Sequence, residues 1–258
     1  MSTLNKAEKT LGKIQYHVRV RPGDVGKYVL LPGDPARSDR VAKYLENAQL
    51  VAHNREYRTF TGTYKGVTIS VTSTGIGCPS AAIAVEELAN VGAENFIRIG
   101  SSAGLQPHIH IGDLLITTGA MKNEGTSRFH VPDAFPAVPD FFLTRTLIDT
   151  AQSMRSELGC EVHVGLSASD DSFYGESPEW IQKLSGWGLN NVEMEASAIF
   201  TVAHVRKCRA AAICAVSGNL VTGEVVYEEE NKGLVQGWEN EIKVVLEAIY
   251  RFETEGKR

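Results

Sequence analysis

The chain of 258 residues is 43% hydrophobic, which is enough apolar sequence to bury a substantial core as a single domain over residues 1–258. Its charged residues, 22% of the total, sum to a net charge of −5 that is spread along the chain, which argues against a nucleic-acid partner and the basic patch such a partner needs. No run of eighteen apolar residues could cross a membrane, and the four scattered cysteines show no zinc-ligand spacing, so we expect a cytoplasmic protein without a membrane partner.

Predicted strands and helices alternate along the chain. A polar stretch at residues 1–13 is expected to be a flexible leader. Short β-rich apolar stretches then predict strands, each followed by a glycine-bearing turn, at residues 28–31, 67–72, 96–99 and 211–216. Apolar residues at helical spacing predict helices at residues 80–91, 195–207 and 234–254, with Pro79 in the first turn of the first helix and Gly92 at its end. This alternation predicts an α/β fold built from βαβ units.

The glycine-bearing turns indicate where a ligand binds. In an α/β fold, ligands bind outside the carboxyl ends of the strands. The predicted strand ends carry small residues, among them Gly33, Gly75, Gly100 and Gly218, which let backbone N–H groups approach an anion closely. The chain has neither the G-x-G-x-x-G pattern of dinucleotide-binding turns nor a P-loop, so the sequence predicts a pocket without identifying its ligand.

Three arginines lie in or near these predicted strand ends. Arg98 interrupts an otherwise apolar strand, where a charge is costly unless it is paired. It is interpreted either as a member of a buried ion pair or as a guanidinium that binds an oxyanion bidentately at the strand's end. Arg37 and Arg55 lie in motif-like turns, although each taken alone is typical of an exposed surface residue.

Two acids and two histidines are further candidates. Glu193 and Glu195 open a predicted helix, where they either complement the helix dipole or accept the hydroxyls of a ribose. His108 and His110 would share one face of a strand, but no further histidine or cysteine stands at ligand spacing, so no metal site is predicted there. The residues considered singly predict an α/β enzyme with an anion-binding pocket and leave its reaction open.

Seven short motifs follow one another along the chain. They are Pro32-Gly33-Asp34-Pro35-Ala36-Arg37, Asn54-Arg55-Glu56-Tyr57, Ser73-Thr74-Gly75-Ile76-Gly77, Arg98-Ile99-Gly100-Ser101, Gln106-Pro107-His108, Phe135-Pro136-Ala137-Val138 and Val192-Glu193-Met194-Glu195. Together they resemble the nucleoside phosphorylase family, which includes uridine phosphorylase, hexameric bacterial purine nucleoside phosphorylase and related nucleosidases, and they are most similar to its uridine-cleaving branch. The resemblance implies a three-layer α/β/α fold with a mixed, barrel-like central sheet, and homodimers that assemble into a homohexamer.

The resemblance also implies roles for particular residues. Phosphate would be bound by residues of this chain and by one arginine of the neighbouring subunit: Gly33, Arg37, Arg98 and Ser101, with Arg55 from the neighbour. The nucleoside would be bound by His17 from across the subunit contact, by Phe173 against the base, and by Glu193, Met194 and Glu195 at the ribose. Glu56, Ile76 and Ser80 match positions that hold a monovalent cation such as K+ between subunits. No cofactor is implied beyond inorganic phosphate as co-substrate.

The implied activity is that of a pentosyltransferase of nucleoside salvage. Phosphate would cleave the N-glycosidic bond of uridine or a close pyrimidine nucleoside, giving the free base and ribose 1-phosphate. No protein nucleophile is needed, because the ribose passes through a cation-like state. Arg98 and Glu195 would be the catalytic residues, the arginine positioning phosphate below C1′ and the carboxylate favouring the positive charge of the sugar.

The segment expected to contact the base departs from the family pattern. Uridine-cleaving relatives place a glutamine and an arginine shortly after the Phe-Tyr pair, whereas here Phe173-Tyr174 is followed by Gly175-Glu176-Ser177-Pro178-Glu179. Purine-cleaving relatives carry an aspartate where this chain reads Ser217-Gly218-Asn219. A purine nucleoside phosphorylase therefore stays open as an alternative. The retained arginines argue against a hydrolytic nucleosidase, and the presence of both Arg98 and Glu195 argues against a non-catalytic nucleoside-binding protein.

Overall fold

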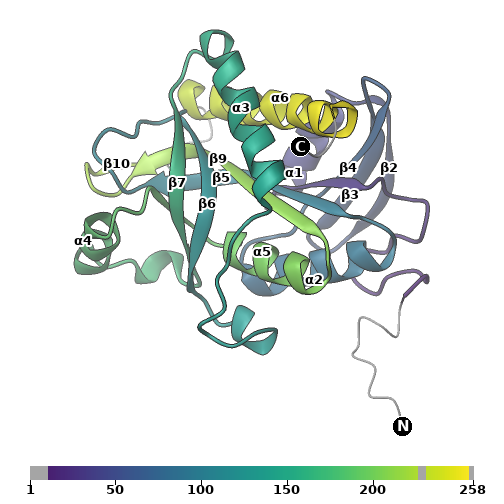
Figure 1. The fold of residues 1–258 in the computed structure, drawn as a ribbon, viewed down its shortest axis with the longest axis horizontal. Coiled ribbons are helices and arrows are strands. Elements are labelled where there is room, and N and C mark those ends of the chain that lie inside the picture. The colour runs from purple at the N-terminus through teal and green to yellow at the C-terminus, as the bar shows by residue number, and fades with distance from the viewer. Residues whose placement is uncertain (1–10, 226–230, 256–258) are drawn as a thin grey trace.

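The computed structural model describes residues 11–225 and 231–255, so residues 1–10 of the predicted leader lie outside the described residues. Within these ranges, the strands form one sheet that carries helices on both faces (Figure 1). The strands are β1 (Tyr28–Leu31), β2 (Glu46–Asn54), β3 (Tyr57–Tyr64), β4 (Val67–Thr72), β5 (Asn95–Gly104), β6 (Leu114–Asn123), β7 (Val162–Asp170), β8 (Asn191–Glu193), β9 (Arg209–Asn219) and β10 (Glu224–Val225). The helices are α1 (Pro35–Ala42), α2 (Cys78–Asn90), α3 (Phe141–Leu158), α4 (Pro178–Gly186), α5 (Ala196–Val205) and α6 (Lys232–Thr254), with short 3-10 helices η2 (Ser127–Phe129) and η3 (Phe173–Gly175).

Part of the sheet closes into a barrel. Strand β5 pairs in parallel with β9, and β9 pairs antiparallel with β6. Strand β6 pairs in parallel with β7, and β7 with β8, which returns antiparallel to β5 and completes the ring. Strands β1, β4, β3 and β2 extend the sheet outward from β5. The predicted fold, three layers around a mixed, barrel-like sheet, is therefore confirmed.

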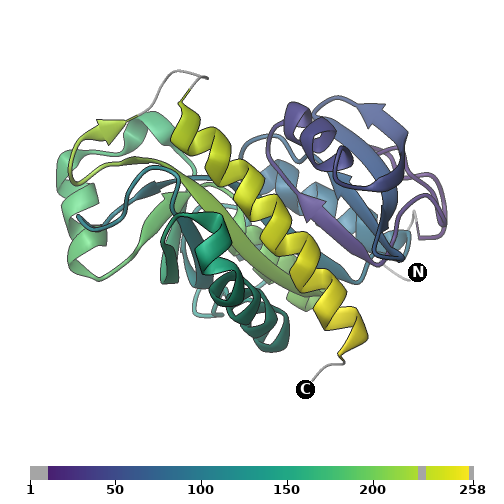
Figure 2. The same ribbon diagram turned by 90° about the horizontal axis from the view of Figure 1, so that it is seen from above.

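Helices cover the two faces of this sheet in pairs. Helices α3 and α6 lie side by side on one face, and α2 and α5 lie side by side on the other (Figures 1 and 2). Successive side chains of a strand point to opposite faces. Accordingly, Ile97 and Ile99 of β5 join the apolar core beneath α6, and Phe96 joins the core beneath α5. Within the described ranges, no helix combines the length and apolar character that crossing a membrane would require.

The ends of the helices follow from local sequence. Helix α2 follows Gly77, whose φ of 101° is a conformation open to glycine, and it carries Pro79 in its first turn. Gly92, with a φ of 106°, directly follows its C-cap. Helix α6 starts after Asn231, whose side chain accepts a hydrogen bond from the Leu234 backbone N–H at 3.1 Å. The predicted signals for the start and end of α2 are confirmed.

Two of the predicted glycine-bearing turns and one predicted strand are wrong. Residues 100–102 and 217–219 lie inside β5 and β9, because the parallel pairing of these strands continues to Gly104 and Asn219. The register of this pairing shifts between Ser102 and Ala103, and both strands continue past these small residues. His108 and His110 lie in the connection between β5 and β6 and share no strand.

Candidate active site

A cavity of about 920 Å3 opens near the ends of β1, β4 and β5, next to β8 and η3. Its walls have two chemically different ends. The arginine end, as we call it, is formed by Gly33, Arg37, Arg98 and Ser101. The aromatic end is formed by Phe173, Tyr174, Glu176 and Leu220. Two of these residues, Glu176 and Leu220, also border a smaller hollow beside α4, which places the aromatic end toward that helix.

Arg98 is held by two carboxylates. It is 4% exposed, its Nε donates to Glu193 Oε2 at 2.7 Å, and its Nη2 forms an ion pair with Glu195. Burial alone would lower the pKa of Arg98, but the carboxylates of Glu195 and Glu193 raise it, so the guanidinium stays charged. The first interpretation of this arginine, a buried ion pair, is confirmed. Arg98 also lines the cavity, and its binding of an oxyanion stays a prediction.

The two neighbouring acids have different surroundings. Glu193 accepts hydrogen bonds from the Ser169 hydroxyl at 2.5 Å, from the backbone N–H of Ala196 at 2.9 Å and from that of Glu195 at 2.8 Å, in addition to Arg98. Its oxygens are therefore occupied in fixing the start of α5. The Glu195 carboxylate accepts a hydrogen bond from the Gly77 backbone N–H at 2.7 Å. Glu195 is 2% exposed and lines the cavity. Burial raises the pKa of Glu195, and Arg98 opposes this shift.

Trp238 of α6 supports the arginine end, and the sequence did not predict it. Its Nε1–H donates to Ser101 Oγ at 2.9 Å, and Arg37 Nη2 donates to the same oxygen at 2.7 Å. The Arg37 guanidinium also lies 4.3 Å from the centre of the Trp238 ring, a cation–π distance. Because Ser101 Oγ accepts two hydrogen bonds, its own hydrogen is free to donate into the cavity.

Glu241, also on α6, is a second residue that the sequence did not predict. It is 1% exposed, and Gly100 donates its backbone N–H to Glu241 Oε2 at 3.1 Å. Burial raises the pKa of Glu241 to about 8, while Arg37 acts in the opposite direction. Trp238 and Glu241 stand three residues apart and therefore share a face of the helix. A tryptophan and an acid at this spacing on a largely apolar helix face were the one feature of the sequence that could have indicated a contact with the site.

The remaining predicted residues fall into two groups. Phe173 and Met194 line the cavity of their own chain, with Phe173 53% exposed. Arg55 and His17 do not line it. Arg55 is exposed in the turn between β2 and β3, and His17 Nδ1 lies 2.6 Å from Glu87 Oε1 on α2. Their expected contribution to a neighbouring subunit stays a prediction.

The predicted cation ligands lie around one turn. The Ser80 hydroxyl is 3.4 Å from the Ile76 carbonyl oxygen, and the Glu56 side chain borders Gly75. In the part of the chain that the structure describes, no three His, Cys, Asp or Glu side chains cluster as metal ligands. An oxygen-only donor set of this kind suits a hard cation.

Asn219 is the polar residue at the end of Ser217-Gly218-Asn219, the stretch in which a purine-type aspartate was considered. Its Nδ2 donates to the carbonyls of Gln106 and Ile109, at 2.8 and 2.9 Å. Its Oδ1 accepts from the backbone N–H groups of Val221 and Thr222, at 2.9 and 3.0 Å. Because both ends of the amide hold the surrounding loops, this side chain has no remaining group for a base.

The fold and the cavity together define a class of α/β enzyme in which guanidinium groups and a buried carboxylate meet at the edge of a closed mixed sheet. The chain belongs to the Phosphorylase superfamily, whose family model matches residues 27–251. It is 44% identical to the uridine phosphorylase of Thermococcus kodakarensis, over 95% of this chain and 91% of that protein. It is 41% identical to the guanosine phosphorylase of Halorubrum lacusprofundi, over 91% of this chain and 98% of that protein.

A solved structure supports the same assignment. The purine nucleoside phosphorylase of Toxoplasma gondii, crystallised with immucillin-H, superposes with a TM-score of 0.86 at 33% identity. The match covers 94% of this chain and 98% of that one. The superposition therefore extends over nearly the whole chain, including the elements that form the cavity.

Proposed function

We propose that the chain catalyses the phosphate-dependent cleavage of the N-glycosidic bond of uridine, giving uracil and ribose 1-phosphate. This is the activity in the name of its Thermococcus kodakarensis relative, which is similar along nearly the whole chain. It makes the protein a pentosyltransferase of nucleoside salvage.

Two buried guanidinium nitrogens carry this proposal. Arg37 Nε and Arg98 Nη1 have no hydrogen-bond partner among the described residues, although both atoms are buried and both residues line the arginine end. A buried donor without an acceptor is costly, so the site is suited to an oxyanion that accepts from both. Together with the free hydroxyl hydrogen of Ser101, these donors match inorganic phosphate.

Glu195 is the group best placed for the sugar. Its carboxylate is anchored by Gly77 and Arg98, which leaves its remaining lone pairs to accept the ribose 2′- and 3′-hydroxyls. A negative charge held beside the ribose stabilises the positive charge that develops at C1′ as the base departs. The arginines hold phosphate for attack on C1′, so orientation and electrostatics lower the barrier without a covalent enzyme intermediate.

A count of charges supports a contribution from a second copy of the chain. In one chain, the carboxylates of Glu193 and Glu195 both pair with Arg98, and Arg37 is the other cation of the cavity lining. The lining also carries Asp34 and Glu176, so it has no net positive charge. A bound phosphate anion therefore needs a further positive group. We assign that role to Arg55 of a neighbouring copy, with His17 reaching the 5′-hydroxyl from the same side, in the homodimer unit of a homohexamer.

Two further assignments complete the proposal. A monovalent cation would be held at the contact between two copies by Glu56, Ile76 and Ser80. The positive charge of the cation would offset the negative charge of the Glu56 carboxylate. A cytoplasmic location is supported by the cysteines, since Cys78, Cys160, Cys208 and Cys214 are all free thiols.

Uridine consumption with and without inorganic phosphate tests this function. We expect uracil and ribose 1-phosphate to form in equal amounts, and only when phosphate is present. Turnover that continues unchanged without phosphate and yields free ribose would identify a hydrolytic nucleosidase instead. Uridine binding without turnover at any phosphate concentration would identify a binding protein, and either result would overturn the proposal.

A further inference from the structure

Glu176 is the one carboxyl group at the aromatic end of the cavity. It follows η3 directly and is partly buried between the cavity and the hollow beside α4. No hydrogen bond or ion pair to its carboxyl group occurs among residues 11–225 and 231–255. A partly buried carboxyl without a protein partner is available to a ligand. Because the arginine end is assigned to phosphate, the base is the part of a nucleoside that we expect beside Glu176.

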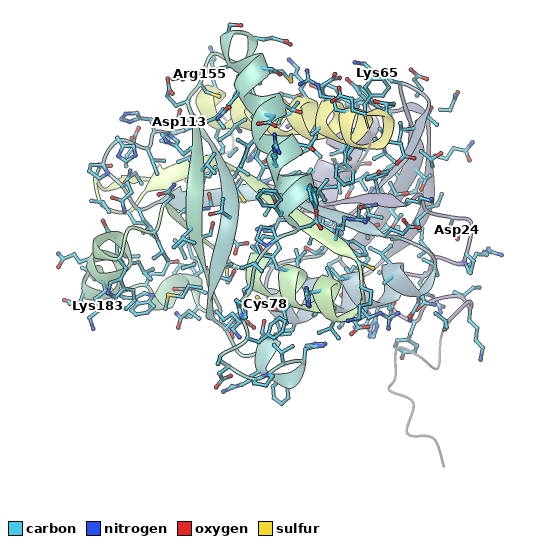
Figure 3. The ribbon with its side chains drawn as sticks, viewed as in Figure 1. Asp24, Lys65, Cys78, Asp113, Arg155 and Lys183 are labelled. Atoms are coloured by element: carbon cyan, nitrogen blue, oxygen red, sulfur yellow. The ribbon has the colours of Figure 1, made fainter. Side chains whose placement is uncertain are left out.

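In the part of the chain that the structure describes, no cation is among the charges that act on Glu176. Asp170 at the end of β7 is the charge that acts on it, and the Asp170 carboxylate is itself held by Asn123 Nδ2 and Trp180 Nε1, each at 2.9 Å. The other charged or titratable groups on the adjoining elements are engaged or exposed: Glu193 with Arg98, and Asp171, Tyr174, Glu179 and Lys183 at the surface. Figure 3 shows Lys183 on the outer side of α4.

A carboxyl group offers different hydrogen bonds in its two protonation states. An ionised carboxylate accepts with both oxygens, which matches two adjacent N–H donors such as N1–H and the 2-amino group of guanine. A neutral carboxyl accepts with one oxygen and donates with the other, which matches an N–H beside a carbonyl, as in N3–H and O4 of uracil. The same ionised carboxylate would place one oxygen against a uracil carbonyl, which is repulsive.

We infer that Glu176 recognises the edge of the base, that its ionised form makes guanosine a substrate of this site, and that its neutral form favours uridine. This inference rests on the proposed phosphorolysis and assigns its base selectivity to one side chain. Burial, followed by the negative charge of Asp170, raises the pKa of Glu176 to about 7, so both forms are populated near neutral pH.

The pH dependence of the selectivity between nucleosides tests the inference. The rate constant kcat/KM would be determined for guanosine, inosine and uridine with saturating phosphate from pH 5.5 to 8.5. Inosine has the N1–H and O6 of guanosine but lacks its 2-amino group, so the guanosine-to-inosine ratio isolates the second donor. Because phosphate ionisation affects all three substrates alike, it cancels in these ratios. We expect both the guanosine-to-inosine and the guanosine-to-uridine ratio to rise about tenfold through pH 7.

Two variants separate this role from a general effect of charge. In Glu176→Gln, the amide is a permanent equivalent of the neutral carboxyl, so both ratios should stay at their low-pH values at every pH. In Glu179→Gln, the same charge is removed from an exposed site outside the cavity, and the wild-type pH dependence should remain. Ratios that do not change with pH, or that still change in Glu176→Gln, would overturn the inference while leaving uridine phosphorolysis intact. Absence of phosphate-dependent turnover with every nucleoside would instead refute the proposed function.

Discussion

The arginine end and the aromatic end of the cavity are built in opposite ways. At the arginine end, Arg98 and its two carboxylate partners, Glu193 and Glu195, are each at most 4% exposed, and Glu193 also binds the backbone at the start of α5. At the aromatic end, Phe173 is 53% and Tyr174 is 98% exposed, on a short 3-10 helix between β7 and α4.

This difference separates what the cavity must always do from what it can change. The arginine end takes Arg98 and Ser101 from β5, and Arg98 is bound to Glu193 of β8, so altering it disturbs the barrel itself. Three of the four residues of the aromatic end, Phe173, Tyr174 and Glu176, lie on one short connection, so the base preference can change without refolding the sheet. Relatives named for a pyrimidine and for a purine nucleoside are accordingly almost equally similar to this chain, at 44% and 41% identity.

The largest effect should follow the removal of Arg98. We expect Arg98→Ala to lower the rate of uridine phosphorolysis by about 10³-fold, because the anion loses its buried donors. The same change leaves Glu193 and Glu195 unpaired in the core, which should lower the free energy of unfolding by about 3–5 kcal/mol. Initial rates and urea denaturation measure the two effects.

Two variants show whether the loss is chemical or structural. Arg98→Lys keeps the charge, so it should recover most of the stability, yet its single ammonium cannot serve two carboxylates and phosphate together and activity should stay low. At the aromatic end, Glu176→Ala should change the free energy of unfolding by less than about 0.5 kcal/mol. Full activity in Arg98→Lys, or comparable destabilisation at both ends, would remove the contrast between them.

The next effect distinguishes the two neighbouring acids. Glu195→Gln keeps an acceptor for the Gly77 N–H but removes the charge that we propose to lie beside the ribose, so kcat/KM for uridine should fall about 10²-fold with a smaller change in stability. Glu193→Gln should do the reverse, because this carboxylate accepts from Ser169, Arg98 and the start of α5. Steady-state kinetics and thermal unfolding of the two variants measure these opposite effects. If both variants lost activity and stability in the same proportion, the two acids would act as one unit.

A third effect concerns Glu241 and pH. Burial raises the pKa of Glu241 to about 8, so between its ordinary value near 4.5 and pH 8 the folded state holds a proton that the unfolded state has lost. The stabilisation from this neutral carboxyl is complete below pH 4.5 and is lost as the pH rises through 8. Glu241→Gln, which cannot ionise, should therefore gain about 2 kcal/mol on the wild type between pH 5 and pH 8. Urea denaturation at both pH values measures this gain in the free energy of unfolding. Because Glu176 is only half-buried, Glu176→Gln should gain less on the wild type over the same pH range.

The sequence predicts the parts of the fold that depend on local pattern. Strands β1 and β4 were predicted to the residue, because short apolar runs buried by the sheet are recognisable by themselves. Strands β2 and β3 were not predicted, since much of β2 is exposed and its pairing is interrupted by register shifts. The extension of β5 and β9 through their glycines depends on pairing between residues more than a hundred positions apart, which no local window contains.

The site divides in the same way. A charged residue inside an apolar strand marks Arg98 directly, and acids at a helix start mark Glu193 and Glu195. Trp238 and Glu241 reach the same end of the cavity from α6, more than 130 positions beyond the residues they bond. Their contribution depends on how α6 packs across the barrel, so physical pattern in the sequence alone could not assign it.

The smallest effects come from a matched pair of tryptophans, one at each end. Trp238 Nε1–H donates to Ser101 at the arginine end, and Trp180 Nε1–H donates to Asp170 near the aromatic end, both at 2.9 Å. Replacing either by phenylalanine removes one donor and keeps an aromatic ring. Trp238→Phe should raise the KM for phosphate about fivefold and leave the KM for uridine unchanged, because Ser101 loses one of its two donors and the Arg37 contact weakens.

Trp180→Phe should act on the other substrate and more weakly. Asp170 keeps its bond from Asn123, so the KM for uridine should change by less than about threefold and the KM for phosphate should not change. Varying one substrate at saturation of the other separates the two constants in each variant. If either substitution shifted both constants equally, the cavity would respond as a single unit. Opposite selectivity in the two variants would show that anion binding and base recognition are energetically independent, as their separate construction predicts.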